Sequence, residues 1–288
     1  MTSLLSAIAQ VLAALGALLS VGSPAAVPAP ATAPTYVAMG DSYTAGPLIP
    51  HQLSDPPGCL RSDHNYPRLV AEARGLSLRD RSCSGAETED LASPQAVRGG
   101  PNPAQLDALD AAVGTVSVQI GGNDIGFHEA LQACAAPLPL GTPCQDRYVR
   151  SGTDESSRRI AATGPKVAAA LAEVRRRSPS AHVLVVGYPA ILPEVHPGCW
   201  PVMPFTPGDV PYIRDKEKEL NAMLATQAAA AGATYVDVYG PSIGHDACQL
   251  PGVRWVEPLI PLAPAAPVHP NALGMRGMAD ALLAALAP

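Results

Sequence analysis

Ser42 lies where a buried strand would end. A short apolar run at residues 36–39 (YVAM) leads directly into residues 40–46 (GDSYTAG), in which glycines flank the serine. A serine hydroxyl attacks a carbonyl usefully only when a base removes its proton and hydrogen-bond donors stabilise the oxyanion that forms. If Ser42 is a nucleophile, the rest of the chain must supply both.

Three further blocks offer the residue types that this chemistry needs. Gly85 lies in residues 82–86 (SCSGA), after a second apolar-leaning segment, and Asn123 lies in residues 121–124 (GGND), after the apolar run 115–120. His269 opens the last apolar helical pattern near the C-terminus. Three of these four blocks follow predicted strands, at the sheet edge where sites of open parallel sheets form.

On these four blocks the chain resembles the SGNH branch of the GDSL hydrolases, from residue 36 to about residue 285. The resemblance implies that Ser42 is the nucleophile and His269 the general base. It also implies an oxyanion hole made by the backbone N–H groups of Ser42 and Gly85 and by the side-chain amide of Asn123. The alternative is that Gly85 only permits a turn and Asn123 only caps a helix, and the four blocks together disfavour it.

The residue three positions before His269 is Ala266, where many members of this family have an aspartate that orients the histidine. We therefore expect a Ser42/His269 dyad in which a backbone carbonyl near Ala266 accepts the Nδ1–H, as in a secreted actinobacterial esterase subgroup that the chain resembles. A carboxylate from elsewhere could still fill the role, and the candidates are Asp124, Asp237 and Asp246.

The remaining acidic residues and histidines near these blocks have simpler interpretations. Asp41 and Asp124 are expected to hydrogen-bond the backbone of their turns. The His245-Asp246 pair lies beside Cys248 in a loop, so we expect a surface histidine there rather than a second base. The same interpretation is given to His51, His64, His128, His182 and His196.

Apolar runs alternate along the chain with helical patterns. Strands are predicted at residues 35–39, 76–81, 115–120, 182–187 and 233–238. Helices are predicted at residues 65–74, 103–112, 155–177, 212–231 and 272–286. This alternation predicts an α/β fold with a parallel sheet between helices, which brings Ser42 and Asn123 to one edge. The resemblance implies a three-layer α/β/α domain with a flavodoxin-like five-stranded sheet, here a single domain at residues 35–288.

The first 34 residues differ in composition from the rest. Residues 4–21 are almost wholly apolar and residues 23–34 are rich in alanine and proline, which is typical of a signal peptide and a leader. No lysine or arginine precedes the apolar run, and an uncleaved membrane anchor is the alternative. We expect export with cleavage, hence a secreted, extracellular protein.

Six cysteines, an even number, support export. None has metal-ligand spacing, so disulfides are expected. Ester hydrolysis by Ser42 and His269 needs no metal or organic cofactor, and none is expected. The resembling subgroup and simple proximity imply the pairs Cys59–Cys83, Cys134–Cys144 and Cys199–Cys248.

Three proline-rich segments, residues 134–152, 189–211 and 240–268, are predicted to be rigid loops that shape a substrate pocket. Their aromatic residues could line an acyl-chain pocket, and ordinary packing over the core is the alternative. These aromatic residues are Trp200, Phe205 and Trp255.

The leading functional hypothesis is a secreted carboxylic-ester hydrolase of the lipase or esterase class, acting through a Ser42 acyl-enzyme. A carbohydrate O-acetyl esterase of the same fold is an alternative that the aromatic content of 4% disfavours. A non-catalytic exported binding protein would not need the complete set of four residues. We expect a monomer that takes a small-molecule or lipid ester and makes transient contact with lipid surfaces. The net charge of −6, with only 19 basic residues, argues against nucleic acid as a partner.

Overall fold

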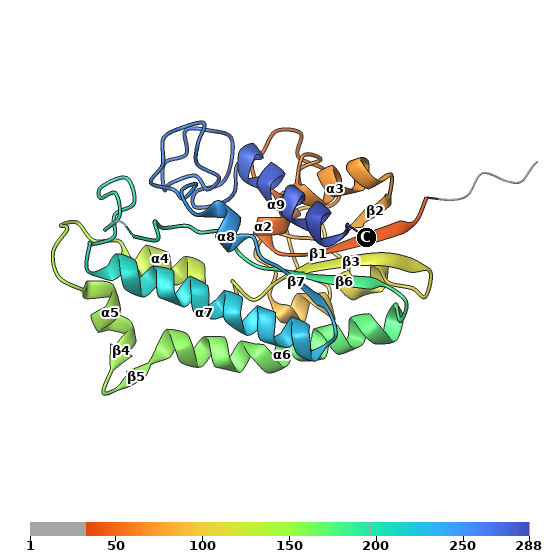
Figure 1. The fold of residues 1–288 in the computed structure, drawn as a ribbon, viewed down its shortest axis with the longest axis horizontal. Coiled ribbons are helices and arrows are strands. Elements are labelled where there is room, and N and C mark those ends of the chain that lie inside the picture. Colours follow the sequence, from red (N-terminus) through yellow and green to blue (C-terminus); the bar gives the residue numbers. More distant parts are fainter. Residues whose placement is uncertain (1–32, 196, 288) are drawn as a thin grey trace, which may run out of the picture. The chain divides into compact units, whose positions relative to one another are not determined.

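Five parallel strands form the centre of the computed structural model, which describes residues 33–195 and 197–287 (Figure 1). Their order across the sheet is β2-β1-β3-β6-β7. The strands are β1 (Thr35–Gly40), β2 (Ser77–Asp80), β3 (Val113–Gln119), β6 (His182–Val186) and β7 (Thr234–Val236). The parallel five-stranded sheet and its flavodoxin-like order, both expected, are confirmed. The predicted signal peptide and leader fall almost entirely outside the described residues, as does His196.

Helices cover both faces of this sheet. They are α2 (Ser42–Ala45), α3 (Tyr66–Arg74), α4 (Phe127–Cys134), α5 (Pro143–Tyr148), α6 (Glu155–Arg177), α7 (Asp209–Ala230), α8 (Tyr239–Ser242) and α9 (Ala272–Ala285). Short 3₁₀ helices are η1 (Pro57–Cys59), η2 (Thr88–Leu91) and η3 (Gln105–Ala108), and β4 (Val149–Arg150) and β5 (Thr153–Asp154) form a small hairpin.

Alternate residues of β1 pack against opposite helical layers. Tyr36 and Ala38 belong to the core beneath α3 and α9, whereas Val37 and Met39 belong to the core beneath α6 and α7 (Figure 1). A strand buried on both faces is a continuous apolar run rather than an alternating pattern, which is why residues 36–39 could be recognised as a strand.

The register of the sheet positions the two segments that carry chemistry. Gly40, the last residue of β1, pairs with Gln119, the last residue of β3. The Asp41 N–H donates to the Gln119 carbonyl at 3.1 Å. The chain segments that follow, with Ser42 on one and Asn123 on the other, therefore leave the sheet side by side.

The predicted helix at residues 103–112 is wrong, because only the single turn η3 forms there. The Leu106 carbonyl accepts from the Leu109 N–H three residues on, as in a 3₁₀ turn, and side chains from elsewhere also donate to carbonyls of this segment. Arg177 donates to the Leu106 carbonyl at 2.9 Å. Ser178 Oγ donates to the Asp110 carbonyl at 2.8 Å. Both of these side chains come from the end of α6, so these contacts are invisible in the local sequence.

The segment 134–152 is also more ordered than a loop, since it contains α5 and β4. The buried carboxylate of Asp209 accepts from the backbone N–H groups of Cys144 and Gln145, each at 2.9 Å. It thereby satisfies donors at the start of α5 that have no partner within the helix. A cap supplied from 64 or 65 residues away cannot be seen in the local sequence.

All three expected cysteine pairs form disulfides: Cys59–Cys83, Cys134–Cys144 and Cys199–Cys248. The first joins η1 to the segment that carries Gly85, and the Ser84 N–H donates to the Cys59 carbonyl at 3.0 Å. Disulfides typically add about 2–4 kcal/mol of stability. Among residues 33–195 and 197–287, no helix is long and apolar enough to cross a membrane.

Candidate active site

Ser42 is the first residue of α2, in the sharp turn that follows β1. The Asp41 carboxylate caps this helix by accepting from the Tyr43 N–H at 2.9 Å. At Gly40, φ is +157°, and a Cβ there would lie 2.6 Å from the Gln119 carbonyl oxygen. Only glycine permits this close approach, and the turn that it allows presents Ser42 at the edge of the sheet.

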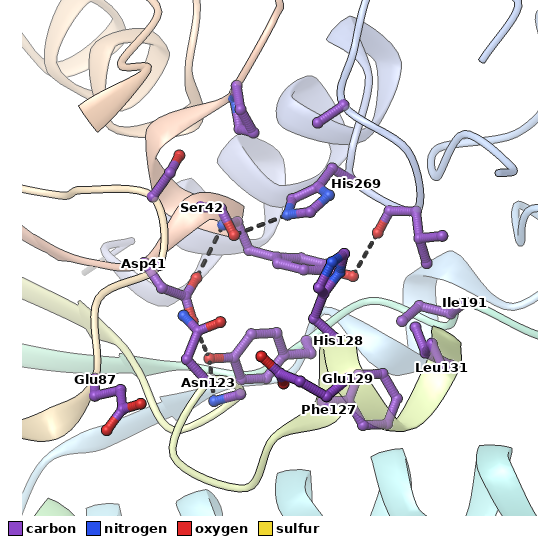
Figure 2. Close-up of a pocket in the computed structure, with 18 of the residues that line it drawn as sticks. Asp41, Ser42, Glu87, Asn123, Phe127, His128, Glu129, Leu131, Ile191 and His269 are labelled. Atoms are coloured by element: carbon purple, nitrogen blue, oxygen red, sulfur yellow. Dashed lines mark hydrogen bonds between the residues drawn. The ribbon is translucent and has the colours of Figure 1, made fainter. Parts of the chain in front are cut away.

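His269 lies just before α9, and its Nε2 is 2.8 Å from Ser42 Oγ (Figure 2). Its other ring nitrogen, Nδ1, is 2.7 Å from the carbonyl oxygen of Pro267, the residue after Ala266. A carbonyl can only accept, so Nδ1 carries the proton and Nε2 is left to accept from the serine hydroxyl. This is the arrangement that a general base requires.

The three alternative carboxylates are engaged elsewhere. Asp124 accepts from the Thr88 N–H, Asp237 from the Tyr239 N–H and Asp246 from the Cys248 N–H, each at 2.9 Å. None of them contacts the His269 ring within the described part of the chain. The only acceptor that the structure gives Nδ1 is the backbone carbonyl.

The residues expected to form the oxyanion hole line the same cavity as Ser42. Gly85 has φ of +79°, a left-handed conformation that favours glycine. The Asn123 amide donates one hydrogen to the carbonyl of Ala86, the residue after Gly85, at 2.8 Å, which fixes the orientation of the amide. Figure 2 shows Asn123 in the wall of the cavity. An amide has two hydrogens, so the second remains for a ligand.

Tyr188 is a residue of this site that the sequence did not reveal. Its hydroxyl donates to Asp41 at 2.5 Å and accepts from the Gly122 N–H at 3.0 Å. The turn that carries Ser42 is thus tied to the turn that carries Asn123. Burial raises the pKa of Asp41 to about 7, although the hydrogen bonds from the Tyr188 hydroxyl and the Tyr43 N–H oppose the shift. The one signal in the sequence was a tyrosine directly after the strand predicted at 182–187.

The other described histidines do not form a second centre. His245 has its ring stacked on Trp255 and its Nδ1 beside the Val253 carbonyl, away from Asp246. His51, His64 and His182 are exposed, as expected. His128 is exposed too, but it also lines the cavity that contains Ser42, which was not predicted (Figure 2). No group of three potential metal-binding side chains occurs among the described residues.

The surroundings of His269 keep its ring neutral. Its pKa is lowered to about 4, mainly by burial among protein atoms and in smaller part by His128, while the hydrogen bond to Pro267 opposes the shift. A neutral imidazole at neutral pH is the form that can accept a proton.

The acid limb of the pH profile of kcat/KM should therefore lie near pH 4 rather than near 6.5. The profile should be measured with a soluble short-chain ester, in the wild type and in Asp41→Asn, because Asp41 itself titrates near pH 7. A histidine with a lowered pKa also costs stability as pH falls through the window from 6.5 to about 4. Unfolding must therefore be followed in parallel. An acid limb at 6.5 in both proteins would contradict a neutral, buried base.

The cavity beside Ser42 has a volume of about 490 Å³ and a largely apolar wall (Figure 2). Its apolar lining includes Phe127, Leu131, Tyr188, Ile191 and Leu220. These residues come from α4, α7 and the segment after β6.

The loop aromatics expected in this wall are not part of it, so that prediction is wrong. Phe205 is fully buried in the core. Trp200 donates to the Ala136 carbonyl at 3.1 Å, and Trp255 stacks on His245. Phe205 therefore fits the alternative, ordinary core packing, whereas Trp200 stays partly exposed. The sequence pattern could not show that the helix after Asn123 would supply the wall instead.

The fold and the site together define a hydrolase of the SGNH type, and comparison with known proteins agrees. The profile of the GDSL-like Lipase/Acylhydrolase family matches residues 38–276. Lipase 2 of Streptomyces coelicolor is 45% identical over 267 residues, which cover 88% of this chain and 87% of that protein.

Two solved structures are similar over nearly their whole length. Phospholipase A1 from Streptomyces albidoflavus has a TM-score of 0.74 and 27% identity, over 88% of this chain and 99% of that one. The extracellular lipase from Streptomyces rimosus has a TM-score of 0.73 and 28% identity, over 88% and 100%. The chain belongs to the GDSL-like lipase/acylhydrolase family and is an ester hydrolase of the lipase and esterase class. The predicted family and enzyme class are confirmed.

Proposed function

We propose that this ester hydrolase cleaves acyl esters through an acyl-enzyme on Ser42, with His269 as the base. The 2.8 Å hydrogen bond between Ser42 Oγ and His269 Nε2 carries the proposal. A serine hydroxyl is a weak nucleophile until an adjacent base takes its proton, and this ring has its free nitrogen directed at the hydroxyl.

In the first half of the cycle, Ser42 Oγ attacks the ester carbonyl while Nε2 takes its proton. The oxyanion that forms accepts from the N–H groups of Ser42 and Gly85 and from the Asn123 amide. The imidazolium is stabilised by the bond from Nδ1–H to the Pro267 carbonyl, and its Nε2–H then protonates the leaving alcohol. Water repeats these steps on the acyl-enzyme, and the proton returns to Ser42.

The apolar cavity supports an acyl chain longer than acetate as the group transferred to Ser42. An acetyl group would leave most of the 490 Å³ unfilled, whereas each methylene that enters contributes up to about 0.8 kcal/mol. This favours a lipase or esterase over a carbohydrate O-acetyl esterase.

Exposed Ile260 and Leu262, on the segment that leads to His269, support transient contact with a lipid surface. Pelleting with phosphatidylcholine vesicles tests that contact, and recovery of all protein in the supernatant would refute it.

Turnover of p-nitrophenyl esters should rise from acetate towards longer acyl chains, because the leaving group is constant and only the chain in the cavity grows. The half-exposed Phe127 offers a test of where the chain lies. Phe127→Ala should lower kcat/KM for octanoate by about tenfold and leave acetate nearly unchanged, and Phe127→Leu should lose much less. An optimum at acetate in the wild type, with Ser42→Ala as the blank, would contradict this part of the proposal.

We also propose that the protein is exported, loses a leader ending near residue 34, and acts as a monomer. The three disulfides support an oxidising location, and one copy of the chain holds both Ser42 and His269. Protein recovered from the culture medium should begin near residue 34 by N-terminal sequencing and have the mass of one chain by light scattering. An intact N-terminus in the membrane fraction would favour the anchor instead.

A further inference from the structure

Val268, the residue before His269, has an unusual backbone conformation. Its φ is +59°, in the left-handed region. A β-branched side chain crowds the backbone there, so valine is rarely found in it and strain must be offset by surrounding contacts. Val268 is buried, and its conformation sets the direction in which the chain enters His269.

Two sets of hydrogen bonds hold this residue. Its N–H donates to the Glu257 carbonyl at 3.0 Å, and the Glu257 N–H donates to the His269 carbonyl at 3.0 Å. The Val268 carbonyl accepts from the hydroxyl of Tyr43 at 2.7 Å, in a buried contact between residues 225 positions apart.

Tyr43 is the residue next to Ser42, and it touches the base in a second way. The centroid of its ring lies 4.9 Å from that of the His269 imidazole, with the planes inclined by 38°. The centroid of its ring also lies 5.1 Å from that of Tyr188, with the planes at 77°, so the Tyr43 ring packs against a second aromatic ring. One side chain therefore contacts both the strained peptide before the base and the face of the base.

We propose that Tyr43 is a positioning residue for His269, because its hydroxyl holds the Val268 carbonyl and so keeps the strained segment in the one conformation that places Nε2 against Ser42 Oγ. This inference rests on the proposed Ser42–His269 mechanism. A site without a carboxylate behind the histidine has only the Pro267 carbonyl to orient Nδ1. That carbonyl belongs to the peptide joined to Val268, so a change in the Val268 φ would alter the geometry between it and the imidazole.

Removal of the hydroxyl should release this constraint while the ring and the cavity wall stay in place. In Tyr43→Phe we expect kcat for p-nitrophenyl butyrate to fall about tenfold, with KM changed by less than about twofold. Tyr66→Phe is the matched control. The Tyr66 hydroxyl is also buried and forms a hydrogen bond of 3.1 Å with Thr44, which lies in α2 as Tyr43 does. It makes no described hydrogen bond to the segment that carries His269. It should lose stability without the loss of kcat.

A double-mutant cycle separates positioning from a general loss of packing. Glycine accepts positive φ without strain. In a Val268→Gly background, loss of the Tyr43 hydroxyl therefore leaves residue 268 with no strain that would drive it out of the left-handed region. There the added Tyr43→Phe change should cost about threefold or less rather than tenfold. Equal costs in both backgrounds, or a Tyr43→Phe enzyme with wild-type kcat, would overturn the proposal.

The proposed function fails in a different way from this inference. If Ser42→Ala retained turnover, the mechanism itself would be wrong, whatever Tyr43→Phe does. If Ser42→Ala is inactive and Tyr43→Phe is fully active, only the positioning role is refuted. Thermal unfolding of each variant shows whether the protein is folded at the assay temperature. The burst of p-nitrophenol gives a second check, because its size falls in proportion to the fraction of unfolded protein.

Discussion

Replacing either Ser42 or His269 by alanine should lower kcat for p-nitrophenyl butyrate by roughly 10⁵–10⁶, and replacing both should cost no more than replacing one. The non-additivity follows from the 2.8 Å hydrogen bond between the two side chains. A base without its nucleophile, or a nucleophile without its base, does nothing, so members of such a unit do not contribute separately. Residual turnover should reflect binding and oxyanion stabilisation alone.

The controls for this pair come from the acidic residues that could have formed a triad. Asp237→Asn is the matched neutralisation, because this carboxylate accepts from the N–H groups of Tyr239 and Gly240 and, in the described part of the chain, makes no hydrogen bond to the His269 ring. It should keep kcat near the wild-type value. A loss as deep as that of His269→Ala, in a folded protein, would replace the dyad by a triad. Multiplicative losses in the Ser42/His269 double variant would instead show that the two residues act in different steps.

Much of the fold was predictable because its information is local. Strands such as residues 36–39 are apolar runs buried on both faces, and the helix at residues 155–177 begins after the capping carboxylate of Asp154. The catalytic candidates were predictable for the same reason. Each follows a strand or opens a helix, so its block of sequence and its place in a parallel sheet could be read together.

The missed features depend on partners far along the chain. The predicted helix at residues 103–112 is reduced to one 3₁₀ turn, and side chains from the end of α6 donate to carbonyls of that segment. The hydrogen bond from Tyr188 to Asp41 joins residues 147 positions apart. The hydrogen bond from Tyr43 to the Val268 carbonyl joins residues 225 positions apart. No periodicity or turn signal encodes such bonds. The cavity wall was misassigned for a similar reason, since aromatic residues in loops pack into the core as readily as around a ligand.

The oxyanion hole offers the other large effect. Asn123→Ala should lower kcat by roughly 10²–10³, about 2.7–4 kcal/mol of transition-state stabilisation, with little change in KM. The amide would bind the oxyanion more strongly than the ground-state carbonyl, so its loss falls on the chemical step rather than on substrate binding. Kinetics with p-nitrophenyl butyrate measure both constants. Asn123→Asp should be at least as slow, because a carboxylate repels the developing negative charge.

The Asn123 amide also holds the turn that carries Gly85, through its hydrogen bond to the Ala86 carbonyl. A control variant must therefore remove a hydrogen bond that holds this turn without removing a donor to the oxyanion. Gln95→Ala does so, because the Gln95 amide donates to the Ser84 carbonyl of the same turn at 3.0 Å. It should lower kcat by less than about tenfold if anchoring is a minor part of the effect.

A phosphonate that mimics the tetrahedral intermediate gives a second measure, since its rate of reaction with Ser42 should fall in Asn123→Ala by a factor similar to that of kcat/KM. Equal losses of kcat in Asn123→Ala and Gln95→Ala would assign Asn123 to the turn and leave the oxyanion to the backbone N–H groups of Ser42 and Gly85.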